Sequence, residues 1–364
     1  MRTRVVMLVD LDYFFAQCEE LRNPALKGKP IVVGMYSGRT EDSGAVTTAN
    51  YLARKYGVKS GIPLFLAKKL LEGVEAVFLP VDFVFYEQVS NKVMQELRNY
   101  ADVLEQVSID EAYLDVTQKV AGSFEVAVDL AREMKNIVKQ RVGLSFSVGV
   151  GPNKLVAKIA CDSQKPDGLT VVKPDEVLSF LAPLPVGRLL GVGKKTALRM
   201  ERLGIKSVGD LARFDVQRLV ETFGKTLGIY FHNAANGVDN EPVKETGEAE
   251  SISRMATLKE DTRDLEVIME KANQLIEDVW RELVNRKLFF KQVGIVAVMT
   301  DLSVHSRSLT LERYTSEVAP LRTVVGQLFE KFLGESELAI RRLGVKISRF
   351  SREQAHQKQL LSYF

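Results

Sequence analysis

Three acidic residues follow two apolar segments of the chain. Asp10 comes directly after the apolar run 5–9, and Asp110 with Glu111 comes directly after the segment 103–109. Carboxylates are ligands that Mg²⁺ prefers, and two such ions can stabilise both the attacking and the leaving oxygen of a phosphoryl transfer. Successive side chains of a strand point to opposite faces, so Asp110 and Glu111 can share one site only across a bend or tight turn. The pattern predicts a phosphoryl-transfer site where two strands end.

Simpler structural roles are also open to the acidic residues of these two segments. Asp12 precedes the amphipathic helical stretch 13–21 and is the expected N-cap of that helix, because a short acidic side chain accepts hydrogen bonds from the first backbone amides. Asp110 and Glu111, taken alone, could form a polar hairpin turn. Neither role explains why acidic residues follow both apolar segments. The shared position of the acids favours a metal site.

A second polar group lies between these acids in the sequence. The pattern 45–56 predicts a helix that Gly57 ends, so Thr48, Tyr51 and Arg54 would lie on one face at spacings of three residues. Two hydroxyls and a guanidinium suit the oxygens of a triphosphate, because the planar fork of Arg matches phosphate geometry. A polar surface stripe is an equally good interpretation of these three residues alone.

Paired glycines mark a possible phosphate-binding loop. Gly191 and Gly193 stand before Lys194 and Lys195, where a helix is expected to begin, and a second Gly-Lys step follows at 224–225. Bare backbone N–H groups, a positive helix end and lysine charges together favour an anion. The arrangement resembles a helix-hairpin-helix, which grips a DNA backbone without reading bases. A solvated basic helix face is the alternative.

The last residues of the chain carry a spaced set of anchors. Gln357 is followed by Leu360, Tyr363 and Phe364, and the three apolar side chains would share one side of a helical or 3₁₀ turn. This spacing resembles the peptide by which replication proteins bind the ring-shaped sliding clamp. The alternative is a C-terminal turn that packs on its own domain.

The composition fits an ordinary multidomain globular protein. The 364 residues exceed what one hydrophobic core usually serves, and the 46% hydrophobic and 27% charged residues are typical values. We expect a cytoplasmic location without membrane insertion, since no long apolar stretch and no leader pattern are present. Cys18 and Cys161 have no metal-site spacing and are expected to be reduced core residues. A net charge of only +3 predicts that any nucleic-acid surface is local.

Four sequence segments in order identify a family. VDLDYFFAQCEE, SGRTEDSGAVTTANYLARKYGVKSGIP, SIDEAYLD and GPNKLVAKIACDSQKPDG resemble the Y-family DNA polymerases, and most closely their DinB-type polymerase IV branch of archaeal kind. The likeness runs from residue 5 to about residue 350. It implies an α+β multidomain fold with palm, fingers, thumb and little finger. It also implies a monomeric, low-fidelity polymerase that copies damaged DNA and has no proofreading domain.

The resemblance assigns roles to residues of the site. It implies that two Mg²⁺ ions are held by Asp10, Asp110, Glu111 and the main-chain carbonyl of Leu11. Phe15 would be the steric gate that excludes a ribose 2′-hydroxyl. The small Gly44 and Ala45 would lie over the nascent base pair. The remaining implied contacts to the incoming dNTP are Phe14, Thr48, Tyr51, Arg54 and Lys165.

The resemblance also predicts the domain boundaries. They are 1–10 and 77–166 for the palm, 11–76 for the fingers, 167–233 for the thumb, 234–244 for the linker, 245–350 for the little finger and 351–364 for the clamp-binding tail. The thumb would bind DNA through Gly191, Gly193, Lys194 and Lys195. In the little finger, where strands are expected at 292–299 and 341–347, the candidate phosphate contacts are Ser253, Arg254, Arg307, Lys346 and Arg349. The acidic linker is not expected to bind DNA.

Two other classes of function use some of the same features. A metal-dependent nuclease would use the three acids but has no need of a triphosphate clamp. A non-catalytic scaffold that binds DNA and clamp would keep the basic patches and the tail but not the acids. The acids and the triphosphate residues together favour template-directed transfer of a nucleotide from a dNTP to a primer 3′-hydroxyl.

Overall fold

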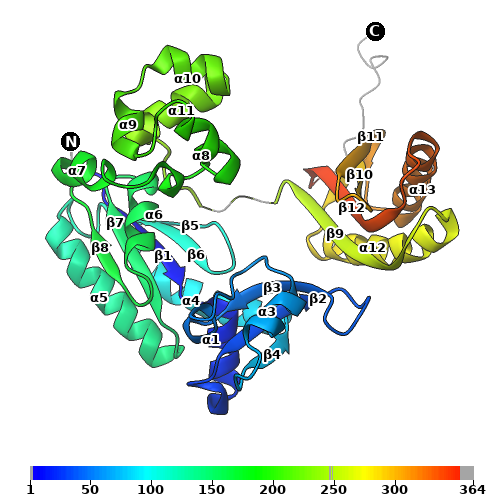
Figure 1. Ribbon diagram of the computed structural model, residues 1–364, viewed down its shortest axis with the longest axis horizontal. Coiled ribbons are helices and arrows are strands. Elements are labelled where there is room, and N and C mark those ends of the chain that lie inside the picture. Colours follow the sequence, from blue (N-terminus) through cyan, green and yellow to red (C-terminus); the bar gives the residue numbers. More distant parts are fainter. Residues whose placement is uncertain (1–2, 246, 248, 353–364) are drawn as a thin grey trace, which may run out of the picture. The chain divides into compact units, whose positions relative to one another are not determined.

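The computed structural model describes residues 3–245, 247 and 249–352 (Figure 1). The chain divides into two compact units. One takes in most of residues 1–247, and the other takes in residues 248–364 with residues 35–45 and 63–66. Within the described ranges, no helix is both long and apolar enough to span a membrane. The predicted clamp-binding residues Gln357, Leu360, Tyr363 and Phe364 lie outside the described part of the chain.

A five-stranded sheet forms the centre of the N-terminal unit. Its strand order is β5-β6-β1-β7-β8, with the bounds Val103–Gln106, Glu111–Asp115, Val6–Leu11, Phe146–Gly151 and Leu169–Val171. The β7–β8 pair is parallel and the other pairs are antiparallel. All six residues of β1 are buried, which confirms the predicted buried strand.

Helices cover both faces of this sheet. Met7 and Val9 of β1 belong to the core that contains α4 (Phe83–Arg98) and α5 (Phe124–Arg141), whereas Val6 and Leu8 pack with Ala157 and Cys161 of α6 (Lys154–Ser163). Side chains alternate along a strand, so the next even-numbered residue of β1, Asp10, belongs to the α6 face.

A smaller sheet follows α1 (Phe14–Arg22), whose position confirms the helix predicted at 13–21. The smaller sheet has the order β3-β2-β4, and its strands are Gly44–Ala49, Ile31–Tyr36 and Val77–Pro80. Short helices accompany it, namely η1 (Pro24–Leu26), α2 (Tyr51–Arg54) and α3 (Leu64–Leu70).

The helix predicted over residues 45–56 is wrong in its first half. Residues up to Ala49 form β3, and only Tyr51–Arg54 are helical. The β-branched run 46–48 suits a strand, and the side chain of Asn50 starts the helix by accepting a hydrogen bond from the Ala53 N–H at 3.0 Å. Thr48 therefore does not continue the helical face of Tyr51 and Arg54.

Short helices with their own core follow the five-stranded sheet. They are η2 (Pro174–Glu176), α7 (Val177–Leu181), η3 (Val186–Arg188), α8 (Lys194–Glu201), α9 (Val208–Arg213), α10 (Val216–Phe223) and α11 (Lys225–Ala235). Met200, Leu211, Leu219 and Phe231 are buried at the centre of this group. The helix starts expected near Lys194 and after Gly224 are both present.

The C-terminal unit is a sheet with two helices on one face. The antiparallel strands have the order β11-β10-β12-β9, with the bounds Val304–Thr315, Phe289–Met299, Ile340–Ser351 and Ser251–Thr262. The helices are α12 (Leu265–Asn285) and α13 (Val318–Glu335). The strands predicted at 292–299 and 341–347 are confirmed. Alternate strand residues such as Ile295 and Val345 are buried in the core with these helices.

The predicted linker is irregular but is held against the N-terminal unit. The Asn153 amide donates to the Gly237 carbonyl at 2.8 Å, and the Leu155 N–H donates to the Asp239 carboxylate at 3.0 Å. Val243 is buried beside β1. One acid of the linker, Asp239, therefore binds the protein itself.

Two strands cross the predicted domain boundaries. The strand β4, inside the predicted palm, pairs with β2 of the predicted fingers, and β8, which starts after residue 166, joins the five-stranded sheet. Both pairings are parallel and join segments that are distant in sequence, so local patterns carry little information about them.

Candidate active site

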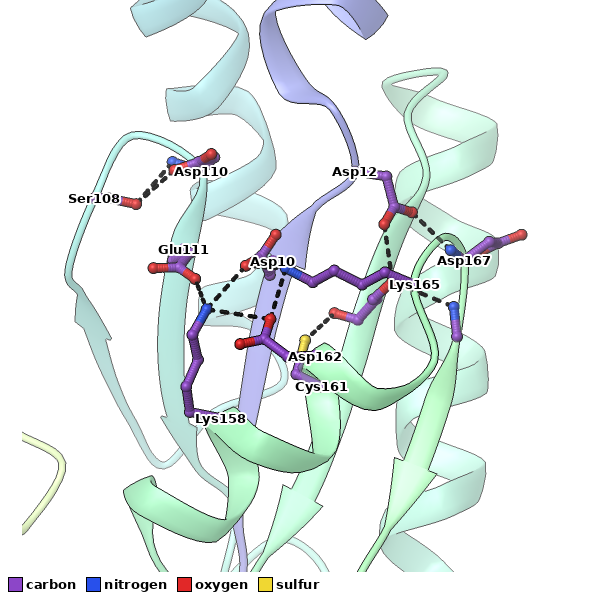
Figure 2. Close-up of polar contacts among 12 residues, drawn as sticks. Asp10, Asp12, Ser108, Asp110, Glu111, Lys158, Cys161, Asp162, Lys165 and Asp167 are labelled. Atoms are coloured by element: carbon purple, nitrogen blue, oxygen red, sulfur yellow. Dashed lines mark hydrogen bonds and ion pairs between the residues drawn. The ribbon is translucent and has the colours of Figure 1, made fainter. Parts of the chain in front are cut away.

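Asp10 and Glu111 meet across two neighbouring strands. They are direct register partners in the antiparallel pair β1–β6, and their side chains turn toward α6 (Figure 2). The Lys158 ammonium of α6 lies between them, 3.2 Å from Asp10 Oδ2 and in contact with Glu111 Oε1. Two carboxylates thus converge on one cation.

A second lysine completes the cluster. The Lys165 Nζ lies 2.5 Å from Asp10 Oδ2 and 2.9 Å from Asp162 Oδ1, and Lys158 is also 3.5 Å from Asp162. Three acids and two lysines therefore form one partly buried cluster of ion pairs beside β1 and α6. The sequence predicted Lys165 but missed Lys158 and Asp162.

The two carboxyls respond differently to this environment. Burial would raise the pKa of Asp10, but its hydrogen bond with Glu111 and the charges of Lys165 and Lys158 hold it below the ordinary value. The pKa of Glu111 is raised to about 7, because burial and the hydrogen bond with Asp10 outweigh the contact with Lys158. Burial opposes the charge on Lys158, yet the contacts with Glu111 and Asp10 raise its pKa. Without a cation between them, the two carboxyls would not both ionise easily. A cation is therefore favoured at this position.

Asp110 lies beside the site with its side chain turned away. The expected tight turn is present between β5 and β6, and the Leu11 N–H donates to the Asp110 carbonyl at 2.9 Å. The Ser108 hydroxyl donates to Asp110 Oδ1 at 2.6 Å, and Figure 2 shows this side chain pointing away from Lys158. In the part of the chain that the structure describes, no three His, Cys, Asp or Glu side chains are arranged as a metal site.

Asp12 is not the helix N-cap that the sequence predicted. The N-cap of α1 is Tyr13, which makes no side-chain capping bond. The Asp12 carboxylate is 1% exposed and accepts hydrogen bonds from Ser147, Ser145 and the Asp167 N–H. Ser147 in β7 and Ser145 just before it bind the carboxylate in place of the first amides of α1, because a buried charge needs nearby hydrogen-bond donors.

The predicted triphosphate residues lie on two elements near these acids. Thr48 is on β3, and the Arg54 guanidinium stacks on the Tyr51 ring at 4.6 Å in α2. Burial and the charge of Asp12 raise the pKa of Tyr51, and the charges of Arg54 and Lys165 oppose this rise. Arg54 Nε donates to the Ala49 carbonyl at 2.8 Å, which fixes the guanidinium beside the end of β3.

An aromatic cluster holds the predicted steric gate. Phe15 on α1 is 8% exposed, and its ring stacks on Tyr86 with centroids 4.5 Å apart and an interplanar angle of 14°. Phe83 meets the Phe15 ring edge-on at 5.8 Å, and Phe14 packs beside both Phe15 and Tyr86. The Tyr86 hydroxyl donates to Glu19 at 2.7 Å, so the stacking partner is itself fixed. Sequence reasoning missed Tyr86.

The glycine loops take the geometry expected of a backbone-binding module. Gly191 has φ +78°, a left-handed conformation that suits glycine, and Gly193 is the N-cap residue of α8. Gly224, with φ +83°, ends α10 and starts α11 in the same way. Lys194 and Lys195 occupy the first two positions of α8, at its positive end.

The predicted DNA contacts of the C-terminal unit differ in their surroundings. Ser253 and Lys346 are register partners on the face opposite the helices. A groove of about 380 Å³ is lined by Lys346, Gln292 and Ser308, and Arg307 also lines it. The guanidinium groups of Arg254 and Arg307 reach acids of the helices, Glu282 at 3.9 Å and Glu335 at 3.0 Å. Arg349 has φ +57° near the end of β12.

Two carboxylates that share lysine contacts at the end of a buried strand pair, with separate glycine turns at helix starts, are the groups that a phosphoryl-transfer enzyme acting on nucleic acid uses. Family models match the chain at residues 9–162 (impB/mucB/samB family), 187–239 (DNA polymerase-iota, thumb domain) and 249–360 (impB/mucB/samB family C-terminal domain). The chain belongs to this family, the Y-family DNA polymerases, in its polymerase IV branch.

Individual relatives agree over nearly the whole length. The chain is 45% identical to DNA polymerase IV of Nitrosopumilus maritimus and 42% identical to that of Methanosarcina acetivorans, with 100% of each chain covered. The solved "Y-family DNA polymerase chimera Dbh-Dpo4(243-245)-Dbh" matches with a TM-score of 0.91 at 37% identity, covering 96% of this chain and 100% of that one. The "Insertion ternary complex of Dbh DNA polymerase" matches with a TM-score of 0.70 at the same identity and coverage.

The family settles the choice among nuclease, scaffold and polymerase. The chain is a DNA-directed DNA polymerase of the low-fidelity class that carries out translesion synthesis. Polymerases of this family are metal-dependent nucleotidyltransferases.

Proposed function

We propose that the chain transfers dNMP from a dNTP to the 3′-hydroxyl of a primer, with two Mg²⁺ ions held by Asp10, Asp110, Glu111 and the Leu11 carbonyl. The contact that carries this proposal is the pairing of Asp10 with Glu111 around one ammonium group. Carboxylates from adjacent strands that already share a cation have the donor chemistry and charge that a divalent cation requires. The residues therefore fit the metal.

The three acids bind metal through their side chains in this proposal. Bound Mg²⁺ would supply charge stabilisation for the attacking and the leaving oxygens. Asp10, at the centre of the cluster, and Glu111 would hold the metal with their carboxylates. Asp110 would be a further ligand, which requires its side chain to rotate away from Ser108. Its backbone is already beside Leu11, so only side-chain torsions need to change.

The incoming triphosphate would lie between the lysine cluster and α2. Lys165 would move from Asp10 and Asp162 to phosphate oxygens, and Arg54 would present its fork while its stacking on Tyr51 limits its motion. Tyr51 and Thr48 would add hydroxyl donors. Phe14 is 2% exposed and packs against Phe15, so it would act by supporting the ring of Phe15.

Phe15 would select the deoxyribose sugar. Its ring is held by Tyr86 and Phe83 and cannot swing aside without breaking both contacts. A rigid planar ring at the C2′ position leaves no room for a 2′-hydroxyl. The proposed substrate is therefore a dNTP and not an rNTP. Gly44 and Ala45 remain the proposed small residues over the nascent pair, which would constrain its geometry weakly.

DNA would be held mainly through its backbone. The proposed thumb contacts are the N–H groups and lysines around Gly191 and Gly193, and the helix-free face of the C-terminal sheet would add Ser253 and Lys346. Arg254, Arg307 and Arg349 remain proposed contacts at the margins of that sheet. The domain boundaries predicted from the sequence are part of this proposal, except that β4 pairs with a strand of the fingers and β8 with a strand of the palm.

A sliding clamp is the proposed further partner. Gln357, Leu360, Tyr363 and Phe364 would bind it and raise the local concentration of primer terminus for a monomeric polymerase with a weak grip. Unchanged clamp-stimulated synthesis after deletion of residues 357–364 would remove this assignment. We also propose that the enzyme works in the cytoplasm, where cells without a nucleus keep their chromosomal DNA.

Primer extension tests the metal site. We expect Asp10→Asn and Glu111→Gln to lower the extension rate with Mg²⁺ about a thousandfold or more, because charge stabilisation of the transferred group is lost. Asp115→Asn is a matched control, because Asp115 lies at the opposite end of β6 and accepts a hydrogen bond from the Thr117 N–H. Extension that survives both active-site substitutions would refute the proposed ligands.

A further inference from the structure

The buried carboxylate of Asp12 has no assigned role and is surrounded by donors. Ser147 Oγ donates to Asp12 Oδ1 at 2.8 Å, and Ser145 Oγ and the Asp167 N–H donate to Oδ2 at 3.2 and 2.8 Å. Neither serine comes from the same segment as Asp12, and Asp167 is 155 residues away along the chain. The carboxylate therefore joins the end of β1 to β7 and to the loop 164–168 (Figure 2).

The loop 164–168 depends on such hydrogen bonds for its shape. Asp167 has φ +54°, a left-handed conformation that a non-glycine residue adopts at a cost. A Cβ on Gly168 would lie 1.6 Å from the Gln164 carbonyl oxygen, so the loop closes tightly on itself. Two further contacts hold the loop. The Gly168 N–H donates to Ser147 Oγ at 3.3 Å, and Lys135 Nζ lies 2.7 Å from Asp167 Oδ1.

This loop carries Lys165, two residues before the anchored Asp167. The Lys165 ammonium reaches 2.5 Å from Asp10 Oδ2, on the same strand end that Asp12 occupies. The Asp167 N–H is fixed two residues after Lys165, so its hydrogen bond to the Asp12 carboxylate is one of the contacts that restrict where the main chain of Lys165 lies. Figure 2 shows Lys165 extending from this loop between Asp12 and Asp10.

The same strand end also fixes α1. Gln17 Nε2 donates to the Asp12 carbonyl at 2.6 Å and to the Ser145 carbonyl at 3.0 Å, and the Ser145 N–H donates back to Gln17 Oε1 at 2.6 Å. Phe15 lies on the turn between Asp12 and Gln17. This second set of bonds does not use the Asp12 carboxylate, so α1 stays anchored when that group alone is changed.

We infer that Asp12 is a positioning residue that holds Lys165 where it meets the triphosphate. The inference rests on the proposed role of Lys165 and adds to it the group that places the lysine. The competing explanation is that the Asp12 carboxylate only stabilises the fold. The two explanations differ in what they predict for nucleotide binding in a protein that remains folded.

The test combines substitutions at both ends of the connection. Asp12→Asn and, separately, Ser147→Ala are compared with the wild type and with Lys165→Ala for the KM of dNTP, the kcat and the dissociation constant of primer-template DNA. We expect the first two to raise the dNTP KM about tenfold while kcat falls less than about threefold and DNA affinity is unchanged. Asp115→Asn, a carboxylate-to-amide change elsewhere in the same sheet, is expected to leave the KM unchanged.

The double variants decide the mechanism. If Asp12 acts through Lys165, adding Asp12→Asn or Ser147→Ala to Lys165→Ala raises the KM less than about twofold further, because coupled residues are not additive. Full additivity, or a loss of kcat and DNA binding together, would overturn the inference. If Asp12→Asn does not fold, the Ser147→Ala series is decisive. A normal KM in Lys165→Ala alone overturns both the role of Lys165 and this inference, without touching the polymerase assignment of the chain.

Discussion

The palm sheet and the little-finger sheet use charge in opposite ways. In the five-stranded palm sheet, charged groups converge in one partly buried cluster, where Asp10 is 8% exposed and shares two lysines with Glu111 and Asp162. In the four-stranded little-finger sheet, Arg254 and Arg307 are half-exposed and pair singly with acids of the helices. The groove on the helix-free face places Lys346 among uncharged side chains such as Gln292 and Ser308.

This difference matches the two tasks. A reaction needs charges fixed before the substrate arrives, and a cluster that already pairs acids with lysines can exchange a lysine contact for a metal or a phosphate. Holding DNA of any sequence needs many weak contacts to the backbone, and exposed single ion pairs are individually worth little. Substitutions in the palm should therefore have large and specific effects, and those in the little finger small and additive ones.

The largest effect in this series is expected at the steric gate. Phe15→Ala should raise the relative rate of ribonucleotide incorporation about a hundredfold, because the ring that occupies the space of the 2′-hydroxyl is removed. Incorporation of each rNTP and dNTP by single-turnover kinetics measures this ratio. Phe223→Ala, at a thumb aromatic contact far from the sugar, serves as the control. Unchanged exclusion of ribonucleotides would move the gate elsewhere.

Removal of the bridging ammonium should destabilise the metal-free protein. Lys158→Met keeps much of the side-chain volume but leaves Asp10 and Glu111 facing each other, and we expect a loss of about 2 kcal/mol in the free energy of unfolding. Urea unfolding in EDTA and in Mg²⁺ measures it.

Mg²⁺ should reduce the loss in the free energy of unfolding that Lys158→Met causes, because a divalent cation replaces the missing charge. Lys92→Met on the exposed side of α4 is the control for loss of a lysine. An equal loss of stability with and without Mg²⁺ would mean that the two cations do not compete for the same carboxylates.

The smallest effects are expected on the little-finger sheet. Lys346→Ala should weaken primer-template binding a few-fold at every sequence and lower the salt slope of affinity by about one unit, as one phosphate contact is lost. Arg307→Ala removes an equal charge, but the Arg307 guanidinium already pairs with Glu335 of a helix. This substitution should therefore change the salt slope of affinity less. Binding titrations over a range of salt compare the two. A larger change for Arg307 than for Lys346 would contradict this expectation.

Local patterns predicted the elements that carry the site. The buried run of β1, the helix α1 and the helix start at Lys194 each follow from apolar periodicity or a glycine step within a few residues. The acids at the ends of two strands were recognisable for the same reason. The spacing of Thr48, Tyr51 and Arg54 suggested a triphosphate site and the family resemblance supported it, whereas Lys165 came from the resemblance alone. All four roles remain proposals.

Long-range contacts account for what the sequence did not predict. Lys158 meets partners 47 and 148 residues away, and Asp12 meets Asp167 across 155 residues, so neither role has a local signal. The helix predicted from residue 45 fails over β3, because the pairing of this strand with β2 leaves no signal in its own residues. The orientation of Asp110 depends on one rotamer and its hydrogen bond to Ser108.

A structure with primer-template DNA, a non-hydrolysable dNTP and Mn²⁺ tests the central claim most directly, because Mn²⁺ can be located by its anomalous scattering. We predict Mn²⁺ bound to Asp10 and Glu111, Asp110 turned from Ser108 toward the metal, and Lys165 on the triphosphate. Lys158 still bridging Asp10 and Glu111, with Mn²⁺ absent from these carboxylates while nucleotide and DNA are bound, would contradict the account.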